Sequence, residues 1–216
     1  MSNISLNSQI SEWISPDVIS KINDLSKTYS QNHPFPHISI PNFLNENKAT
    51  KIKQALYEIE FQEYNCDLFH FYKSPDFKFI KDLPQILKDF HTFIFSKQAR
   101  EFFKTLTSLQ IHDTKVGDLH SILCQKTHYL LCHDDQVDER IIAFIVNLSE
   151  DFVEEDGGAL ELFNKTDDNK PNEITQQIIP KFNQLNVFNV SPISFHQINE
   201  IETEKDRISI SGWYYK

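Results

Sequence analysis

Two side chains that can bind a metal stand two residues apart near the middle of the chain. His133 and Asp135 end the run that starts at His128, and the apolar part of this run predicts a strand. Residues two apart on an extended chain point to the same side, so the imidazole and the carboxylate are expected to lie together while Asp134 points away. Taken alone, these residues also fit a polar turn between two strands. A tight metal site needs at least a third ligand from elsewhere in the chain.

The candidate third ligand is His196, which follows the apolar run Leu185–Val190. Two histidines and one carboxylate match the facial arrangement of a non-haem iron(II) site, which leaves positions open for oxygen and a chelating co-substrate. Zinc could occupy the same atoms, although structural zinc sites prefer four ligands, often sulfur. Another zinc arrangement, on His128, Cys132 and His133, is weaker, because neighbouring residues of a strand point apart.

A candidate anion-binding group follows His196 by eleven residues. Strand alternation places Arg207 and Ser209 on one face and Ile208 on the other. An arginine inside a sheet is costly unless an anion meets it. A diacid co-substrate that chelates the metal at one end would supply that anion, and the hydroxyl of Ser209 could add a hydrogen bond. The alternative is an outward Arg207 in a surface salt bridge.

The elements that must position these residues divide the chain into a helical and a strand-rich part. Apolar residues at helical spacing predict helices from Ser15 to about Tyr29, from Glu46 to about Phe61, after Asp82 and after Ser96. Residues 32–41 are rich in proline and predict an extended strand at a sheet edge, with His33 and His37 at its ends. Residues 62–81 are aromatic and lack a clean period, which indicates a loop or short strands.

Short apolar or alternating runs separated by turn-forming residues predict about eight strands after Leu109. They are Gln110–Asp113, Asp118–Cys124, Thr127–Cys132, Arg140–Leu148, Ala159–Phe163, Glu173–Ile179, Leu185–Val190 and Asp206–Tyr215. Strands at this spacing favour a jelly-roll or a closed sandwich. We therefore expect an α+β fold, with residues 1–216 forming a single domain made of a helical part, 1–108, and a jelly-roll core, 109–216.

Composition narrows the class of protein. The formal net charge of −10 argues against direct nucleic-acid binding, because nucleic-acid-binding proteins usually carry a basic face, and it is compatible with a basic peptide or protein partner. Three cysteines are an odd number and suggest free thiols in a reducing compartment. Residues 1–9 lack the pattern of a signal peptide, and no run is long enough to span a membrane. We expect a soluble cytoplasmic protein.

Five ordered motifs together resemble the 2-oxoglutarate- and iron(II)-dependent dioxygenases, and most closely the prolyl hydroxylase branch that modifies a ribosomal protein. They are His133–Asp135, Arg140–Leu148, Gly157–Phe163, Ser191–Gln197 and Arg207–Trp213, and residues 34–43 add a further likeness near the start. The resemblance implies a double-stranded β-helix. It implies His133, Asp135 and His196 as iron ligands and Arg207 as the anchor of 2-oxoglutarate, and it allows ascorbate as an accessory cofactor.

The same resemblance implies hydroxylation of a prolyl residue in a protein or peptide, with release of succinate and CO2. A ribosomal protein is the expected partner, and no membrane partner is expected. Alternatives are a hydroxylase of a free amino acid or small molecule, and a non-catalytic module that senses a metal or 2-oxoglutarate.

The sequence departs from the resemblance at two points. Cys124 stands where many relatives have a tyrosine that helps to hold the co-substrate, and Tyr129 is a candidate replacement. Eukaryotic relatives continue into a second sheet domain beyond the position of Lys216. If that domain presents large substrates, we expect the choice of target to differ.

Overall fold

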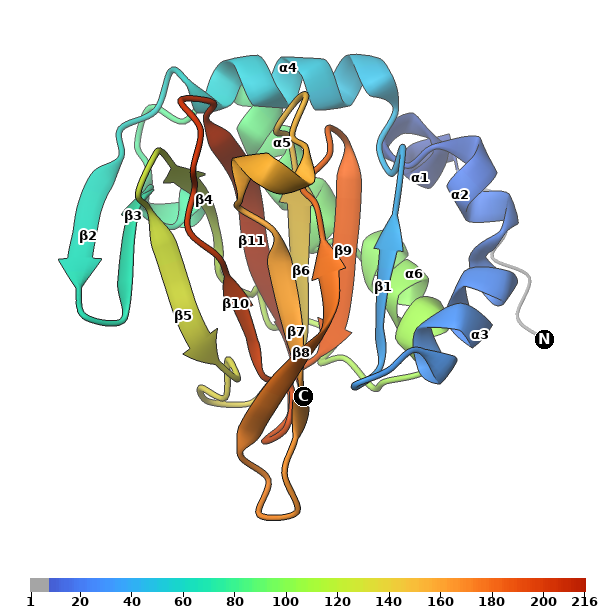
Figure 1. Ribbon diagram of the computed structural model, residues 1–216. Helices are drawn as coiled ribbons and strands as arrows, with labels where there is room; N and C mark the ends of the chain where they lie inside the picture. Colours follow the sequence, from blue (N-terminus) through green and yellow to red (C-terminus); the bar gives the residue numbers. More distant parts are fainter. Residues whose placement is uncertain (1–7) are drawn as a thin grey trace.

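A computed structural model describes residues 8–216. No signal peptide was expected in residues 1–9, and the first seven of these lie outside the described range. The described chain forms one antiparallel sheet, flanked by helices (Figure 1). The strand order is β1-β9-β6-β11-β4-β3-β5-β10-β7-β8, and β2 pairs with β3. Strands β9 and β7, each next to an end of this order, line a common cavity, so the sheet curls over on itself. The expected jelly-roll fold is confirmed.

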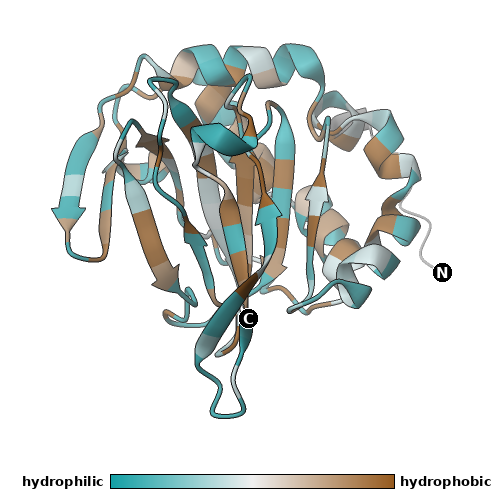
Figure 2. Ribbon diagram, in the orientation of Figure 1, coloured by the Kyte–Doolittle hydropathy of each residue, from teal (hydrophilic) through white to brown (hydrophobic). Residues whose placement is uncertain are grey.

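The strands are short, and several match the predicted runs closely. They are β1 His37–Ile40, β2 Gln62–Cys66, β3 Phe69–Lys73, β4 Leu119–Cys124, β5 Tyr129–His133, β6 Arg140–Asn147, β7 Leu160–Lys165, β8 Pro171–Ile178, β9 Gln184–Asn189, β10 His196–Ile198 and β11 Arg207–Tyr215. The extended strand predicted at a sheet edge is β1, which pairs only with β9. The tip of the β7–β8 hairpin projects from the sheet and is hydrophilic (Figure 2).

The helices cover one face of the sheet (Figure 1). They are α1 Ser8–Trp13, α2 Pro16–Ser20, α3 Ile22–Gln31, α4 Glu46–Leu56, α5 Gln85–Ile94 and α6 Lys97–Thr107, with short 3-10 turns at Phe77–Phe79 and Glu154–Asp156. Ser96 caps α6 as predicted, because its Oγ accepts a hydrogen bond from the backbone N–H of Ala99. Apolar residues of these helices and of β6, β9 and β11 form the largest core cluster. Its burial supplies the main driving force for the fold.

Two expectations about local structure are wrong. Residues 110–113 form no strand: the N–H of His112 donates to the carbonyl oxygen of Tyr215, but its own carbonyl accepts from the buried guanidinium of Arg100, 2.7 Å away, rather than from a strand. The helix predicted from Ser15 to Tyr29 is two helices that meet at Lys21. His37 lies at the start of β1, as predicted; it is buried, and its Nδ1 lies 2.8 Å from the carbonyl oxygen of Phe35.

In the part of the chain from residue 8 onwards, no helix has the length and apolar character needed to cross a membrane.

Candidate active site

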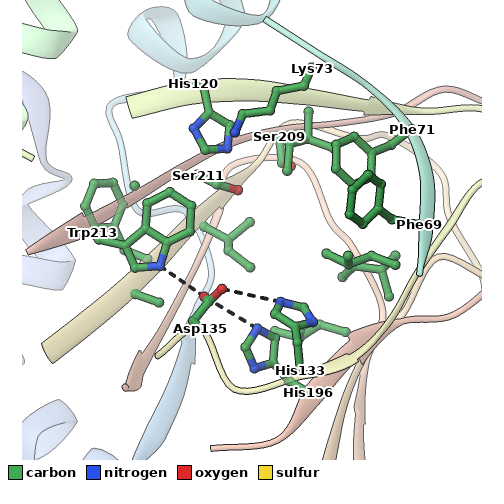
Figure 3. A pocket seen from close by; sticks show the side chains of 18 of the residues that line it. Phe69, Phe71, Lys73, His120, His133, Asp135, His196, Ser209, Ser211 and Trp213 are labelled. Carbon is green, nitrogen blue, oxygen red and sulfur yellow. Dashed lines mark hydrogen bonds and ion pairs between the residues drawn. The ribbon is translucent and has the colours of Figure 1, made fainter. Parts of the chain in front are cut away.

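The three predicted metal ligands meet at one place in the sheet. His133 ends β5 and His196 begins β10, and antiparallel pairing sets these two residues directly opposite each other. Their ring centroids are 4.2 Å apart. Asp135 lies between them, with its oxygens 3.4 Å from Nε2 of His133 and 3.6 Å from Nε2 of His196 (Figure 3). One ligand atom from each residue lies within 4.8 Å of the others, so the cluster could hold a metal ion.

Asp135 reaches this position by a route that the sequence did not predict. The strand ends at His133, and Asp135 adopts a left-handed backbone conformation with φ of 60°. A non-glycine residue with positive φ is uncommon and marks a turn or a functional constraint. The prediction that the two side chains lie together is confirmed, but a turn brings them together rather than strand alternation. The carboxylate of Asp134 instead accepts a hydrogen bond from the backbone N–H of Gln136.

Backbone carbonyls orient both imidazoles. Nδ1 of His133 lies 2.8 Å from the carbonyl oxygen of Leu131, and Nδ1 of His196 lies 2.8 Å from that of Ser194. A carbonyl oxygen only accepts, so each Nδ1 carries a hydrogen, and in the neutral form of each ring Nε2 has a lone pair available to a metal. Hydrogen bonds of this kind fix the tautomer and the ring direction of metal-binding histidines.

The charges of the cluster suit a cation. Burial works to raise the pKa of Asp135, but hydrogen bonds from His133 and Trp213 and the charge of His196 outweigh it and hold the pKa well below its usual range. Burial lowers the pKa of His196 to about 4, so this imidazole is neutral at pH 7. For His133, burial works to lower the pKa, but the hydrogen bond and charge of Asp135 raise it. An anionic carboxylate beside two orientated imidazoles is a suitable donor set for a divalent transition metal.

Arg207 and Ser209 lie on the cavity side of β11, as strand alternation predicted, whereas Ile208 belongs to the core on the other side. Arg207 is 2% exposed. Its Nε donates to the carbonyl oxygen of Gly158 at 2.7 Å, but its Nη2 and the Oγ of Ser209 have no hydrogen-bond partner among residues 8–216. Buried polar groups are normally satisfied. An acidic ligand in the cavity would satisfy both, and the alternative of a surface salt bridge for Arg207 is wrong.

The cavity that contains these residues has a volume of about 240 Å³ and is mostly apolar. Its apolar lining includes Phe69, Phe71, Ile122, Leu130, Leu160, Phe188 and Ile198. Cys124 also lines it, at the position paired with Arg207 across β4 and β11. Tyr129 does not replace the tyrosine of relatives, since it is not among the lining residues and its hydroxyl lies 3.4 Å from the carbonyl oxygen of Cys66.

The alternative zinc arrangement does not form. The ring of His128 lies 4.0 Å from that of His70. Within the described chain, the metal-binding cluster joins His133 to Asp135 and His196, without His128 or Cys132.

The sequence patterns did not identify some of the residues that line the cavity. The indole Nε1 of Trp213 donates to Oδ2 of Asp135 at 3.0 Å and holds this carboxylate in place. Lys73 and His120 also line the cavity, on β3 and β4 (Figure 3). Alternation within Leu119–Cys124 places His120 on the same face as Cys124, and this signal could have identified it. Lys73 follows the aromatic stretch without a clean period, which gave no such signal.

Comparison with known proteins defines the class. Residues 119–215 match the model of the 2OG-Fe(II) oxygenase superfamily, and all three predicted metal ligands and Arg207 fall within this range. This part of the chain is a 2OG-Fe(II) oxygenase domain, from a family whose metal and co-substrate are iron(II) and 2-oxoglutarate.

Particular relatives are prolyl hydroxylases. The chain is 34% identical over 184 residues to prolyl 3-hydroxylase OGFOD1 of Xenopus laevis, covering 84% of this chain and 35% of that protein. It is 30% identical over 205 residues to prolyl 3,4-dihydroxylase OGFOD1 of Ostreococcus tauri, covering 85% and 38%. The chain thus spans about a third of the length of these relatives. A prolyl hydroxylase of Trichoplax adhaerens, solved with a peptide fragment of hypoxia inducible factor, shares the fold at a TM-score of 0.69, with 16% identity and 93% of each chain covered.

Proposed function

We propose that this chain is a 2-oxoglutarate- and iron(II)-dependent dioxygenase that hydroxylates a prolyl residue of a protein and releases succinate and CO2. The observation that carries the proposal is the pairing of two features in one cavity. A two-histidine, one-carboxylate cluster lies in the same cavity as a buried guanidinium with an unsatisfied Nη2.

Each group has a distinct role in this proposal. His133, Asp135 and His196 bind iron(II), and Trp213 holds the carboxylate of Asp135 towards it. Iron(II), when bound, supplies the redox chemistry with oxygen that amino-acid side chains lack. Ascorbate as an accessory cofactor stays a prediction.

Arg207 and Ser209 are proposed to bind the distal carboxylate of 2-oxoglutarate. The planar guanidinium can grip a carboxylate with two hydrogen bonds, and its bond to Gly158 fixes its direction. The apolar lining excludes water from the rest of the cavity. Cys124 beside Arg207 adds no strong hydrogen-bond donor, since burial raises the pKa of its thiol and keeps it neutral.

The substrate is proposed from the relatives. Two proteins similar to this chain are named prolyl hydroxylases, and a solved structure with the same fold holds a peptide. We propose a protein or peptide substrate, with a ribosomal protein in the cytoplasm as the target. The net charge of −10 supports a basic protein partner rather than direct binding to nucleic acid. Packing of the N-terminal helices on the sheet supports a single functional domain over residues 1–108 and 109–216.

Turnover of 2-oxoglutarate tests the proposal. Purified protein with iron(II) and 2-oxoglutarate should form succinate, and proline-containing peptides from ribosomal proteins should gain the mass of one oxygen atom. Asp135→Ala should abolish both signals, and Arg207→Met should lose them at 2-oxoglutarate concentrations that just saturate the wild type. Lys165→Met should abolish neither, because Lys165 is exposed on β7, outside the cavity.

The outcomes of this assay separate the alternatives. Succinate with oxidised free proline but unmodified peptides would favour a small-molecule hydroxylase. Iron(II) binding without succinate formation under any condition would favour a non-catalytic module and contradict the proposal.

A further inference from the structure

Besides Arg207, two cationic residues line the cavity, Arg140, which is paired with Asp118, and Lys73. Lys73 ends β3 and pairs with Ile122 of β4, which in turn pairs with Ser209 of β11. The three residues form a row across the sheet and all line the cavity. Arg207 belongs to the adjacent row, opposite Cys124. Figure 3 shows the side chain of Lys73 extending over the cavity to the ring of His120.

Lys73 is half-buried and has no ion-pair partner within 4.0 Å in the described part of the chain. The nearby acids are already engaged. Asp118 pairs with Lys78 at 3.0 Å and with Arg140 at 3.5 Å. Asp76 pairs with Lys78 at 3.1 Å. Burial, with the charge of Arg140, lowers the pKa of Lys73, so the protein itself does not compensate this ammonium fully.

His120, the neighbour of Lys73 in the cavity, does not share the positive charge of the Lys73 ammonium. His120 is 4% exposed, and burial together with the charge of Lys73 lowers its pKa to about 3. The imidazole is therefore neutral at pH 7 and can donate or accept one hydrogen bond beside the ammonium. The ring of His120 lies 5.3 Å from that of Trp213, which contacts Asp135. Trp213 thus lies between His120 and Asp135, and Lys73 and His120 face His133 and His196 across the cavity (Figure 3).

We propose that Lys73, with His120 beside it, binds a carboxylate of the substrate next to the residue that is modified. The inference rests on the proposed function and deepens it, because it makes Lys73 a residue that selects substrates with a carboxylate beside the target proline, which a basic protein can also carry. A partly desolvated ammonium gains most from an anion, and Arg207 is already proposed to hold the carboxylate of the co-substrate. The carboxylate comes from an acidic side chain that flanks the target proline or from the free α-carboxylate of the target itself.

Matched probes distinguish these sources. One set contains N-acetylated, C-amidated tripeptides with Glu or Gln on either side of proline. The other set is N-acetylproline and N-acetylproline amide. Binding is measured by NMR titration of protein loaded with zinc(II) and 2-oxoglutarate, so that the readout is affinity rather than turnover. Lys73→Met removes the charge at similar length, Lys73→Arg keeps it, and Lys165→Met is the control for loss of a lysine outside the cavity.

Wild type should bind the acidic member of one set about tenfold more tightly than its neutral partner. Lys73→Met should remove this preference, whereas Lys73→Arg and Lys165→Met should retain it. A preference confined to the tripeptides assigns the carboxylate to a flanking side chain, and one confined to N-acetylproline assigns it to a free α-carboxylate.

Equal affinity of wild type for acidic and neutral probes would overturn the inference. So would an equal loss of affinity for both probes in Lys73→Met. A thermal melt of each variant checks that it is folded, and Lys73→Gln is a second neutral variant if the methionine variant does not fold. Failure of 2-oxoglutarate to bind wild type would overturn the proposed function instead, and the binding assay detects this separately.

Discussion

Strand β11 separates two regions with opposite chemistry. On the side of the helices, Ile208 and Ile210 are fully buried in an apolar core. On the cavity side, Arg207 and Ser209 are equally buried but keep polar atoms without partners among residues 8–216. Apolar burial stabilises a fold, whereas an unsatisfied buried polar group costs about 1–3 kcal/mol. We therefore expect this strand to supply stability from one face and, in the proposed function, binding energy from the other.

Substitution of two neighbours on β11 should separate these contributions most clearly. Ile208→Ala should lower the free energy of unfolding by about 2–5 kcal/mol, because it opens a void in a close-packed core. Arg207→Met should leave stability unchanged or raise it, because a buried charge is replaced by an apolar side chain of similar length. Denaturant unfolding measures both.

The same pair should show the reverse pattern in ligand binding. Arg207→Met should weaken 2-oxoglutarate binding by about 100-fold, since charge-assisted hydrogen bonds are lost, while folded Ile208→Ala should bind normally. Calorimetry on zinc-loaded protein gives the affinities. A large loss of stability in Arg207→Met with unchanged 2-oxoglutarate affinity would mean that the cavity face is structural.

Gly158 offers an intermediate case, because on the cavity side it packs against both an apolar side chain, Ile201, and the guanidinium-bearing Arg207. Its φ is +72°, and an added Cβ would lie 2.6 Å from Cδ1 of Ile201 and 3.0 Å from Cδ of Arg207. Gly158→Ala should lower the free energy of unfolding by about 1–3 kcal/mol and weaken 2-oxoglutarate binding by displacing Arg207. Unfolding and binding measurements on one sample would test this, and unchanged 2-oxoglutarate affinity would show that Gly158 does not position the guanidinium.

A smaller, pH-dependent effect should arise from His120. Its pKa is about 3 in the folded protein and about 6.5 when exposed, so only the unfolded chain gains a proton as the pH falls below about 6.5. Stability should therefore be fully present above pH 6.5 and decline towards pH 3. Between pH 7.5 and pH 5 this histidine should contribute a loss of at most about 2 kcal/mol.

His120→Gln should reduce that decline, and urea unfolding at the two pH values measures it. The remaining decline should come partly from His196, whose pKa is also lowered by burial. An identical decline in wild type and variant would show that His120 does not stay neutral in the fold.

Sequence patterns predicted the parts of the fold that depend on regular alternation. The two faces of β11 follow from the period of two, and the helices from apolar spacing and from the cap at Ser96. Gln110–Asp113 has the same alternating pattern, but Arg100 donates a hydrogen bond to the carbonyl of His112. The pattern of the four residues themselves gives no sign of this bond. The three-residue strand β10 was too short to show any period.

The sequence predicted which residues form the candidate site better than it predicted how they are arranged. Residue types and the family resemblance identified His133, Asp135, His196 and Arg207. The positive φ of Asp135 and the bond from Trp213 depend on tertiary packing, which residue spacing does not encode. The direction of Tyr129, away from the cavity, is set by the pairing of β5 with β3 and could not be inferred from its distance along the chain.

Anaerobic titration with iron(II) and then 2-oxoglutarate tests the central claim most directly. Wild type should bind iron(II) and then develop a metal-to-ligand charge-transfer absorption when 2-oxoglutarate is added. Asp135→Ala should lose the iron, whereas Arg207→Met should keep the iron and need far more 2-oxoglutarate to develop the absorption. Iron binding that survives Asp135→Ala, or an absorption that responds identically in wild type and Arg207→Met, would contradict the account.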